Sequence, residues 1–211
     1  MPPADRFIPR FVAEPPQEGL PYGRWADRLA EEFLATCAQA TDGESEVGAP
    51  GDIAWYPDRT WNGLTYVPAS ALTDRGQELF GYVRFTPTEQ EGGEPERFAA
   101  LADYTEETAE RNPDWKLDVC DEVIGSWRGH GGRHAQMTLV WGRALTPGGR
   151  IATAELGGVV VDQCELDQER FTLIAPDDYG SDLLEIALFD GRGRELARES
   201  LYAQDEEHEH D

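Results

Sequence analysis

The eight residues Trp127–His134, WRGHGGRH, combine two of the four histidines of the chain with two arginines and three glycines. Imidazole and carboxylate groups are good ligands for zinc or iron, so one interpretation of this segment is a metal site. Its ligands would be His130 and His134, together with Asp121 or Glu122. A His-x3-His pair shares one face only on a helix, however, and the glycines make a helix costly at this point.

The same segment could instead bind an anion. Glycine N–H groups together with Arg128 and Arg133 could form a nest for a phosphate or for an acidic partner. The segment lacks the Lys-Ser/Thr pair and the following helix of a P-loop. A third interpretation needs no ligand, because the segment can be the tip of a long hairpin that joins a strand at 115–127 to a strand at 134–145. We predict this hairpin tip, with the two arginines as a rare positive spot.

The strand expected at 115–127 would place Asp118, Cys120 and Glu122 on one face, because side chains alternate along a strand. A pair of carboxyl groups can perform acid–base chemistry if burial or a neighbouring charge raises one pKa. A cysteine nucleophile would need a histidine beside it, which one of the loop histidines could supply. Like charges on a solvated strand face are the commoner arrangement, and we favour that interpretation.

Aromatic side chains are concentrated in the segment 55–66, WYPDRTWNGLTY. They could form the rim of a ligand site by stacking on sugars or other flat groups, and such residues are also favoured anchors of protein interfaces. Packing in the hydrophobic core is the simplest alternative. Outside the core, we expect an interface rather than a small-molecule site. The residues concerned are Trp55, Tyr56, Asp58, Arg59, Trp61 and Tyr66.

Motifs that would name a reaction are missing from the sequence. It has no G-x-S-x-G, H-E-x-x-H, C-x-x-C, Walker or Rossmann fingerprint. Asp177, Asp178 and Asp182 could offer oxygen ligands to calcium, but their spacing is not that of an EF-hand. The three cysteines, an odd number at distant positions, predict free buried thiols rather than a disulfide framework. We therefore expect no cofactor and no metal.

The chain is strongly acidic, with 42 acidic and 18 basic residues and a formal net charge of −24. A solvated, self-repelling surface is the simplest meaning of this charge. Since no basic patch is present to neutralise phosphates, we expect no direct binding to nucleic acid. No segment is apolar over the length that a membrane helix needs, and the N-terminus lacks the apolar region of a signal peptide. We therefore expect a cytoplasmic protein with no membrane contact.

Hydrophobic periodicity predicts two helices in the N-terminal half. The first spans residues 22–39 and ends in the polar run TDGESEVGAPGD. Its apolar stripe consists of Trp25, Leu29, Phe33, Leu34 and Cys37. The second helix is predicted at 95–111, with Phe98, Leu101 and Ala102 as its buried face. It would end before Pro113, because a residue that precedes proline avoids the helical region.

Short β-branched or aromatic runs separated by turn residues predict strands elsewhere. Three of them, at 52–57, 64–72 and 78–87, form a meander with Asn62-Gly63 as a hairpin turn. In the third, Leu79, Val83 and Phe85 share a face with Gly81. The remaining strands are predicted at 115–127, 134–145, 150–162, 168–175, 183–189 and 194–202. TPGGR and DGRGR are predicted hairpin loops, and LGGVVVDQCEL resembles a strand buried on both faces.

These elements predict a mainly β (α+β) protein, an antiparallel β-sandwich or strongly curved sheet with two helices in its N-terminal half. Residues 1–21 form a proline-rich extended arm whose apolar residues dock on the domain or on a neighbouring subunit. Residues 22–204 form a single β-rich domain with a possible boundary near residue 112. Residues 205–211 form a disordered acidic tail.

We expect a non-enzymatic protein–protein interaction or assembly module, whose partner is another protein or a second copy of the chain. The apolar residues of the arm, the aromatic segment, the acidity and the lack of catalytic motifs favour this function. One alternative is a small-molecule-binding protein or enzyme with its site where the loop 128–134 meets the strand 115–127. Another is an acidic decoy that binds a basic or nucleic-acid-binding protein, and it requires carboxylates spread over one continuous face.

Overall fold

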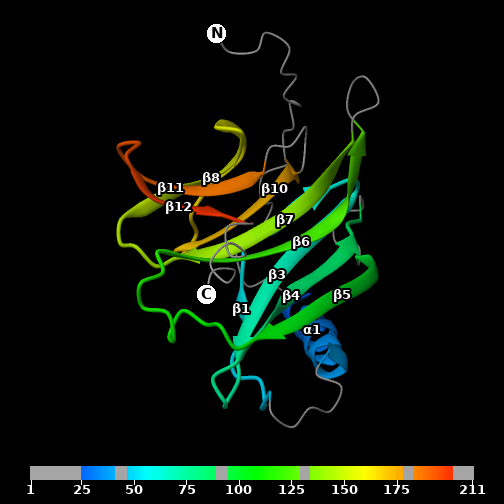
Figure 1. The fold of residues 1–211 in the computed structure, drawn as a ribbon. Helices are drawn as coiled ribbons and strands as arrows, with labels where there is room; N and C mark the ends of the chain where they lie inside the picture. Colours follow the sequence, from blue (N-terminus) through cyan, green and yellow to red (C-terminus); the bar gives the residue numbers. More distant parts are fainter. Residues whose placement is uncertain (1–24, 41–46, 89–94, 129–133, 178–182, 202–211) are drawn as a thin grey trace, which may run out of the picture. The chain divides into compact units, whose positions relative to one another are not determined.

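The structure, a computed structural model, describes residues 25–40, 47–88, 95–128, 134–177 and 183–201 (Figure 1). Of these described residues, 61% lie in strands and 10% in helix, and the sheets are antiparallel. The mainly β, antiparallel prediction is thereby confirmed. The predicted arm, the acidic tail and the loop tip 129–133 lie outside the described residues. The chain divides into two compact units, one that ends at Asp118 and one that begins at Val119.

The first unit contains one helix and one sheet. Its strands follow the order β1-β3-β4-β5, and β2 also pairs with β3. The meander predicted from the sequence is therefore present, and its strands pair in antiparallel fashion. The elements are α1 (Ala26–Ala40), β1 (Ala54–Trp55), β2 (Arg59–Trp61), β3 (Leu64–Leu72), β4 (Glu78–Thr86) and β5 (Glu96–Thr105).

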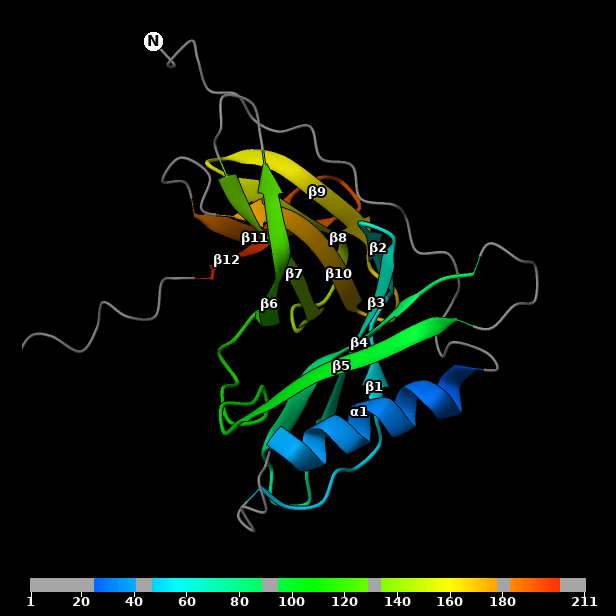
Figure 2. The same ribbon diagram turned by 90° about the vertical axis from the view of Figure 1, so that its right-hand side faces the viewer.

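Helix α1 lies across one face of this sheet, against β4 and β5 (Figure 2). Leu29, Phe33 and Cys37 are buried at a spacing of four residues, as the periodicity predicts. They pack on the sheet face that includes Leu79, Val83 and Phe85. Leu34, which we also assigned to the apolar stripe, is 37% exposed. The buried face of this helix is narrower than the predicted stripe.

The turn between β2 and β3 is the Asn62-Gly63 hairpin predicted from the sequence. Asn62 has a φ of 52° and Gly63 a φ of 74°, the two successive positive values that a type I′ turn requires. Trp61 pairs with Leu64 directly across the turn. The geometry of this turn therefore sets the register of β2 and β3, and with it the residues that share a face.

The second predicted helix is wrong, because residues 96–105 form strand β5. Phe98, Ala100, Ala102 and Tyr104 alternate along it and pack on the core beneath α1. The positions of Phe98 and Ala102 fit both a helix and a strand, and pairing with β4 selects the strand. A Cβ at Gly81 of β4 would lie 2.0 Å from the carbonyl oxygen of Leu101, so glycine permits this close approach.

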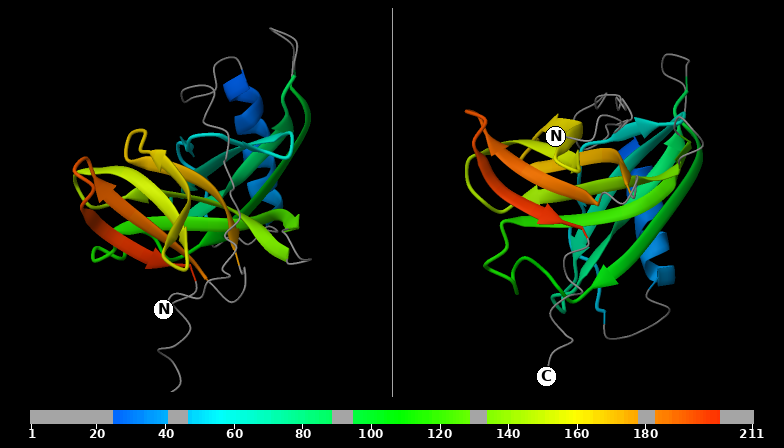
Figure 3. Two further views of the ribbon diagram at one scale, coloured as in Figure 1. Left: turned by 90° about the horizontal axis from the view of Figure 1, so that it is seen from above. Right: turned by 45° about the horizontal axis from the view of Figure 1, so that its top comes forward.

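The second unit contains two sheets. One has the strand order β10-β7-β6 and the other the order β12-β11-β8-β9 (Figure 3). The strands are β6 (Leu117–Arg128), β7 (His134–Ala144), β8 (Gly149–Leu156), β9 (Val159–Glu165), β10 (Arg170–Asp177), β11 (Leu184–Asp190) and β12 (Glu195–Ser200). Both faces of β7 and β10 are largely buried.

Two connections in this unit differ from prediction. The strand predicted at 150–162 is two strands, β8 and β9, because Gly157 and Gly158 adopt φ values of 57° and 77° and turn the chain. LGGVVVDQCEL is therefore a hairpin and not one strand buried on both faces. TPGGR joins β7 to β8, which belong to different sheets, so it is no hairpin loop. DGRGR does form the predicted hairpin between β11 and β12.

A buried carboxylate links the two sheets of the second unit. Asp162 of β9 accepts a hydrogen bond of 2.9 Å from the backbone N–H of Ile174 in β10, the outermost strand of its sheet. Asp177 is fully buried and accepts a bond of 3.1 Å from the N–H of Leu184. The two carboxylates thus accept hydrogen bonds from backbone N–H groups, as buried N–H groups require. Within the described residues, no helix has the length and apolarity to cross a membrane.

Candidate functional site

The structure describes only the two ends of the WRGHGGRH segment. Arg128 ends β6, His134 begins β7, and both side chains are exposed. The two strands are neighbours in one sheet, as the hairpin interpretation predicts. His130 and Arg133 lie outside the described residues. Among the residues that are described, no three His, Cys, Asp or Glu side chains are grouped as a metal site would need.

The acidic face of β6 contains Asp118, Cys120 and Glu122, which are all half-buried. Asp121, their neighbour on the opposite face, has a perturbed pKa although part of the residue is exposed at the surface. Burial raises the pKa of Asp121, and the negative charge of Asp177 raises it further. The sequence could not indicate this coupling, because Asp177 lies on another strand, far away in the chain.

The aromatic segment 55–66 does not gather on one face. Trp55 lies on the α1 side of the sheet, with its ring centroid 6.2 Å from that of Phe33. Trp61 pairs with Leu64, two residues from Tyr66, and so it shares the opposite face with Tyr66. Core packing is therefore the role of Trp55. The two tryptophans do not form one rim.

The face of this sheet that bears Tyr66 is polar and buried. Tyr66 pairs with Arg59 on one side and with Arg84 on the other. Burial raises the pKa of Tyr66, and a hydrogen bond with Arg84 partly offsets this. Asp58 and Arg59 are only 1% and 2% exposed, so these two charged residues are not part of an open rim.

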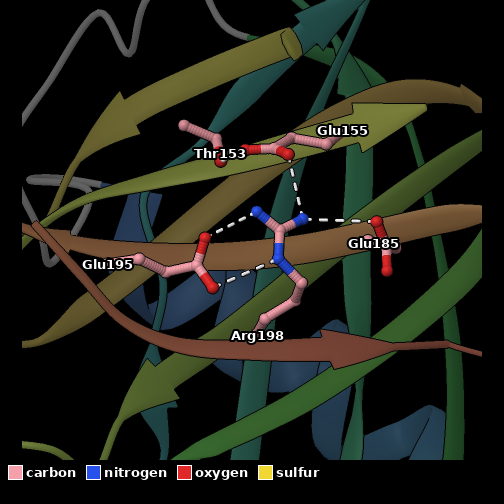
Figure 4. Close-up of polar contacts among 5 residues, drawn as sticks. All are labelled: Thr153, Glu155, Glu185, Glu195 and Arg198. Atoms are coloured by element: carbon pink, nitrogen blue, oxygen red, sulfur yellow. Dashed lines mark hydrogen bonds and ion pairs between the residues drawn. The ribbon is translucent and has the colours of Figure 1, made fainter. Parts of the chain in front are cut away.

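A charged network covers part of the four-stranded sheet of the second unit (Figure 4). The side chain of Arg198 on β12 reaches across β11 toward β8. Its Nη1 donates to Glu155 at 2.9 Å and to Glu185 at 3.2 Å, while Nη2 donates to Glu195 at 2.7 Å. The hydrogen bond with Glu195, followed by that with Glu155, raises the pKa of Arg198.

Two small side chains shape this network. Ala187 of β11 is the register partner of both Thr153 and Arg198, so only a methyl group lies under the path of the arginine. Ala187 is completely buried. Thr153 donates a hydrogen bond of 3.0 Å to the second oxygen of Glu155. Glu155 is therefore held from two sides, by Thr153 and by Arg198.

Exposed aliphatic side chains gather at one end of the same sheet. Val159 is 39% exposed, Val160 47% and Leu183 48%. They are three of the six large hydrophobic residues that are exposed in the described part of the chain. Val159 pairs with Leu156, which in turn pairs with Leu184, so all three lie where β8 ends and β9 and β11 begin. We call Val159, Val160 and Leu183 the apolar sheet end.

The apolar sheet end directly adjoins the charged network. Glu155 pairs with Val160 on one side and with Glu185 on the other. Leu183 precedes Glu185 by two residues and so shares its face. Two aliphatic side chains, Val160 and Leu183, therefore flank the adjacent carboxylates Glu155 and Glu185. We did not expect a site here from the sequence, although the Gly157-Gly158 dipeptide could have predicted the turn that exposes the valines.

No family model, no curated protein and no solved structure matches this chain. The function is therefore inferred from the geometry of the chain itself. Among the described residues, the most distinctive arrangement is the apolar sheet end beside the carboxylates of the Arg198 network.

Proposed function

We propose that this protein is a non-enzymatic protein–protein interaction or assembly module, and that the apolar sheet end is its contact surface. One observation supports the proposal: Val159, Val160 and Leu183 are exposed at one end of a sheet in which Leu156, Val161, Leu184, Ile186 and Leu188 are buried. An isolated exposed valine is ordinary on a soluble protein, but a cluster of aliphatic residues rimmed by polar groups marks interaction sites.

The surface also has the layout of a non-obligate interface. Such interfaces combine an apolar centre with a polar rim that remains accessible to water. Here Glu185 forms part of the rim, and its side chain is 37% exposed. Arg198 and Thr153 hold the neighbouring Glu155 in place. A rim that is already ordered loses little conformational entropy when a partner binds.

Removal of the aliphatic groups tests the proposal. In the double variant Val160→Ser, Leu183→Ser, we expect loss of the proteins that co-purify with the wild-type chain from its own cells, with little change in folding. The measurement is quantitative mass spectrometry of the purified complexes, combined with thermal unfolding of each variant. Exposed substitutions change stability by less than about 0.5 kcal/mol, so loss of partners would not reflect unfolding.

The matched control is Leu72→Ser, because Leu72 is 43% exposed but belongs to the first unit. This variant should retain the partners. If Leu72→Ser and the double variant have the same effect, or if neither changes the co-purifying set, the apolar sheet end is not the contact surface. A wild-type chain that is a monodisperse monomer with no co-purifying protein would contradict the interaction function as a whole.

One observation favours the alternative of a small-molecule-binding protein or enzyme with its site along β6. Perturbed carboxyl groups are concentrated at functional sites, and the pKa of Asp121 is raised. A thermal-shift screen with metabolites tests this alternative: a true ligand would stabilise the wild type more than Asp121→Asn. The acidic-decoy alternative stays a prediction that a map of surface potential can test.

A further inference from the structure

The chemistry around the apolar sheet end indicates which kind of partner it fits. Building on the proposed interaction function, we infer that this surface binds a protein segment in which aliphatic side chains alternate with lysine or arginine. Val160 and Leu183 contact the aliphatic side chains of that segment. Glu185 contacts its cation.

The local charge beside the patch is negative. Glu155, Glu185 and Glu195 surround the single guanidinium of Arg198, so three negative charges meet one positive charge. The side chain of Glu155 is only 9% exposed, whereas that of Glu185 is 37% exposed. Glu185 therefore offers carboxylate surface to a cation that comes from outside the chain.

The spacing of the groups matches an extended segment. Glu155 lies between Val160 and Glu185 in neighbouring strands, and adjacent strands are about 5 Å apart. Leu183 lies two residues before Glu185, which corresponds to about 7 Å along a strand. Val160 and Glu185 are therefore two strands apart, about 10 Å, and Leu183 is about 7 Å from Glu185, so one extended segment can reach all three. A segment with basic and aliphatic residues is complementary in both charge and polarity.

A second copy of this chain is a poorer occupant of the surface. A two-fold pair would place the same patch on both sides of the interface and bring carboxylates against carboxylates. The formal net charge of −24 per chain adds long-range repulsion to that contact. A basic segment instead gains attraction from both the local and the overall charge, and this also speeds its association.

Fluorescence polarisation with a labelled peptide that alternates lysine and valine tests this inference on the full chain. We expect the wild type to bind the peptide, and Val160→Ser, Leu183→Ser to weaken binding by about tenfold or more, because two buried aliphatic contacts are lost. Glu185→Gln should weaken binding about two- to fivefold, the size of one partly exposed ion pair. Glutamine at this position can still accept the hydrogen bond from Arg198.

Two controls separate this site from general attraction to an acidic protein. Glu165→Gln removes one exposed carboxylate at the opposite end of the same sheet, where Glu165 pairs with Ile151, and should leave binding unchanged. A peptide that alternates lysine and serine keeps the charge but lacks the aliphatic groups, and should bind at least about tenfold more weakly. The inference is overturned if Glu165→Gln matches Glu185→Gln, or if the two peptides bind equally.

The inference and the proposed function can fail separately. If the double variant loses its cellular partners but still binds the lysine–valine peptide as the wild type does, the interaction function stands and the basic partner is wrong. If the double variant instead converts a wild-type dimer to a monomer, a second copy is the occupant. If the cellular partners do not depend on Val160 and Leu183, the proposed contact surface itself is wrong.

Discussion

At the scale of single residues, the structure places ionisable groups where their surroundings shift the pKa. The thiol of Cys37 lies on the buried face of α1, and burial raises its pKa to about 11, so it stays protonated and unreactive at neutral pH. The buried-thiol prediction is confirmed for this residue. Cys120 and Cys164 form no disulfide, as predicted, but they are only half-buried.

Asp121 gives a prediction about the pH dependence of stability. Its folded-state pKa is raised above the ordinary value of 3.8, so the folded protein binds this proton more tightly than the unfolded chain does. The free energy of unfolding therefore falls as pH rises from 3.8 through the folded-state pKa. Asp121→Asn removes this charge and its repulsion from Asp177, and should be more stable than the wild type at neutral pH, with a smaller difference below pH 3.8. Urea unfolding at both pH values measures this.

The control for this prediction is Glu165→Gln, which removes an exposed carboxylate from the same unit. It should shift stability little at either pH. A wild type that is more stable than Asp121→Asn at neutral pH would show instead that the Asp121 carboxylate is stabilised by a favourable contact.

At the scale of elements, side-chain hydrogen bonds compensate for incomplete strand pairing. Strand β10 ends its sheet, and its central N–H group at Ile174 is satisfied by Asp162 from β9. An unsatisfied strand edge would cost free energy and invite association with other chains. Short edge strand β12 is protected differently, by the charged residues Glu195, Arg198 and Glu199.

Replacement of Asp162 tests this role. Asp162→Ala leaves a buried N–H without an acceptor, which costs about 1–3 kcal/mol of unfolding free energy. Denaturant unfolding gives the total loss, and hydrogen exchange should show faster exchange at the Ile174 amide in particular. Gln163→Ala is the matched control, because the neighbouring side chain is exposed. Equal losses in the two variants would mean that the effect comes from strand β9 in general and not from this hydrogen bond.

At the scale of the whole molecule, the main physical feature is the large negative charge. A formal net charge of −24 on 211 residues produces self-repulsion in the folded state, and this repulsion is screened by salt. We expect the melting temperature to rise as sodium chloride is added from low ionic strength and to level off at a few tenths molar. Differential scanning calorimetry over a salt series measures this. A melting temperature that falls with added salt would mean that attractive ion pairs, such as those of Arg198, outweigh the repulsion.

The chain also divides at this scale into two units, each with its own sheet or sheets. The sequence suggested a possible boundary near residue 112 within a single domain, and the structure separates the units after Asp118. That the two units unfold together as one cooperative domain stays a prediction. Calorimetry of the full chain, compared with the two-state enthalpy, can distinguish one transition from two.

Local features of this protein could be predicted from the sequence because their causes lie within a few residues. The stripe of α1 follows from the period of a helix, and the Asn62-Gly63 turn follows from the positive φ that both residues tolerate. The strand limits of β3 and β7 were also close to those in the structure. By contrast, β5 and the division of β8 from β9 depended on pairing or on glycine geometry that apolar periodicity does not contain.

The sequence by itself determined the chain's acidity, its high β content, its first helix and two of its hairpin turns, Asn62-Gly63 and DGRGR. Only the tertiary structure decided which strands became neighbours, and with that the position of the candidate site. Glu155, Glu185 and Arg198 come from three strands, and no spacing in the sequence connects them. The physical reason is that sheet order depends on contacts between distant segments, whereas helix periodicity and turn geometry depend on adjacent residues.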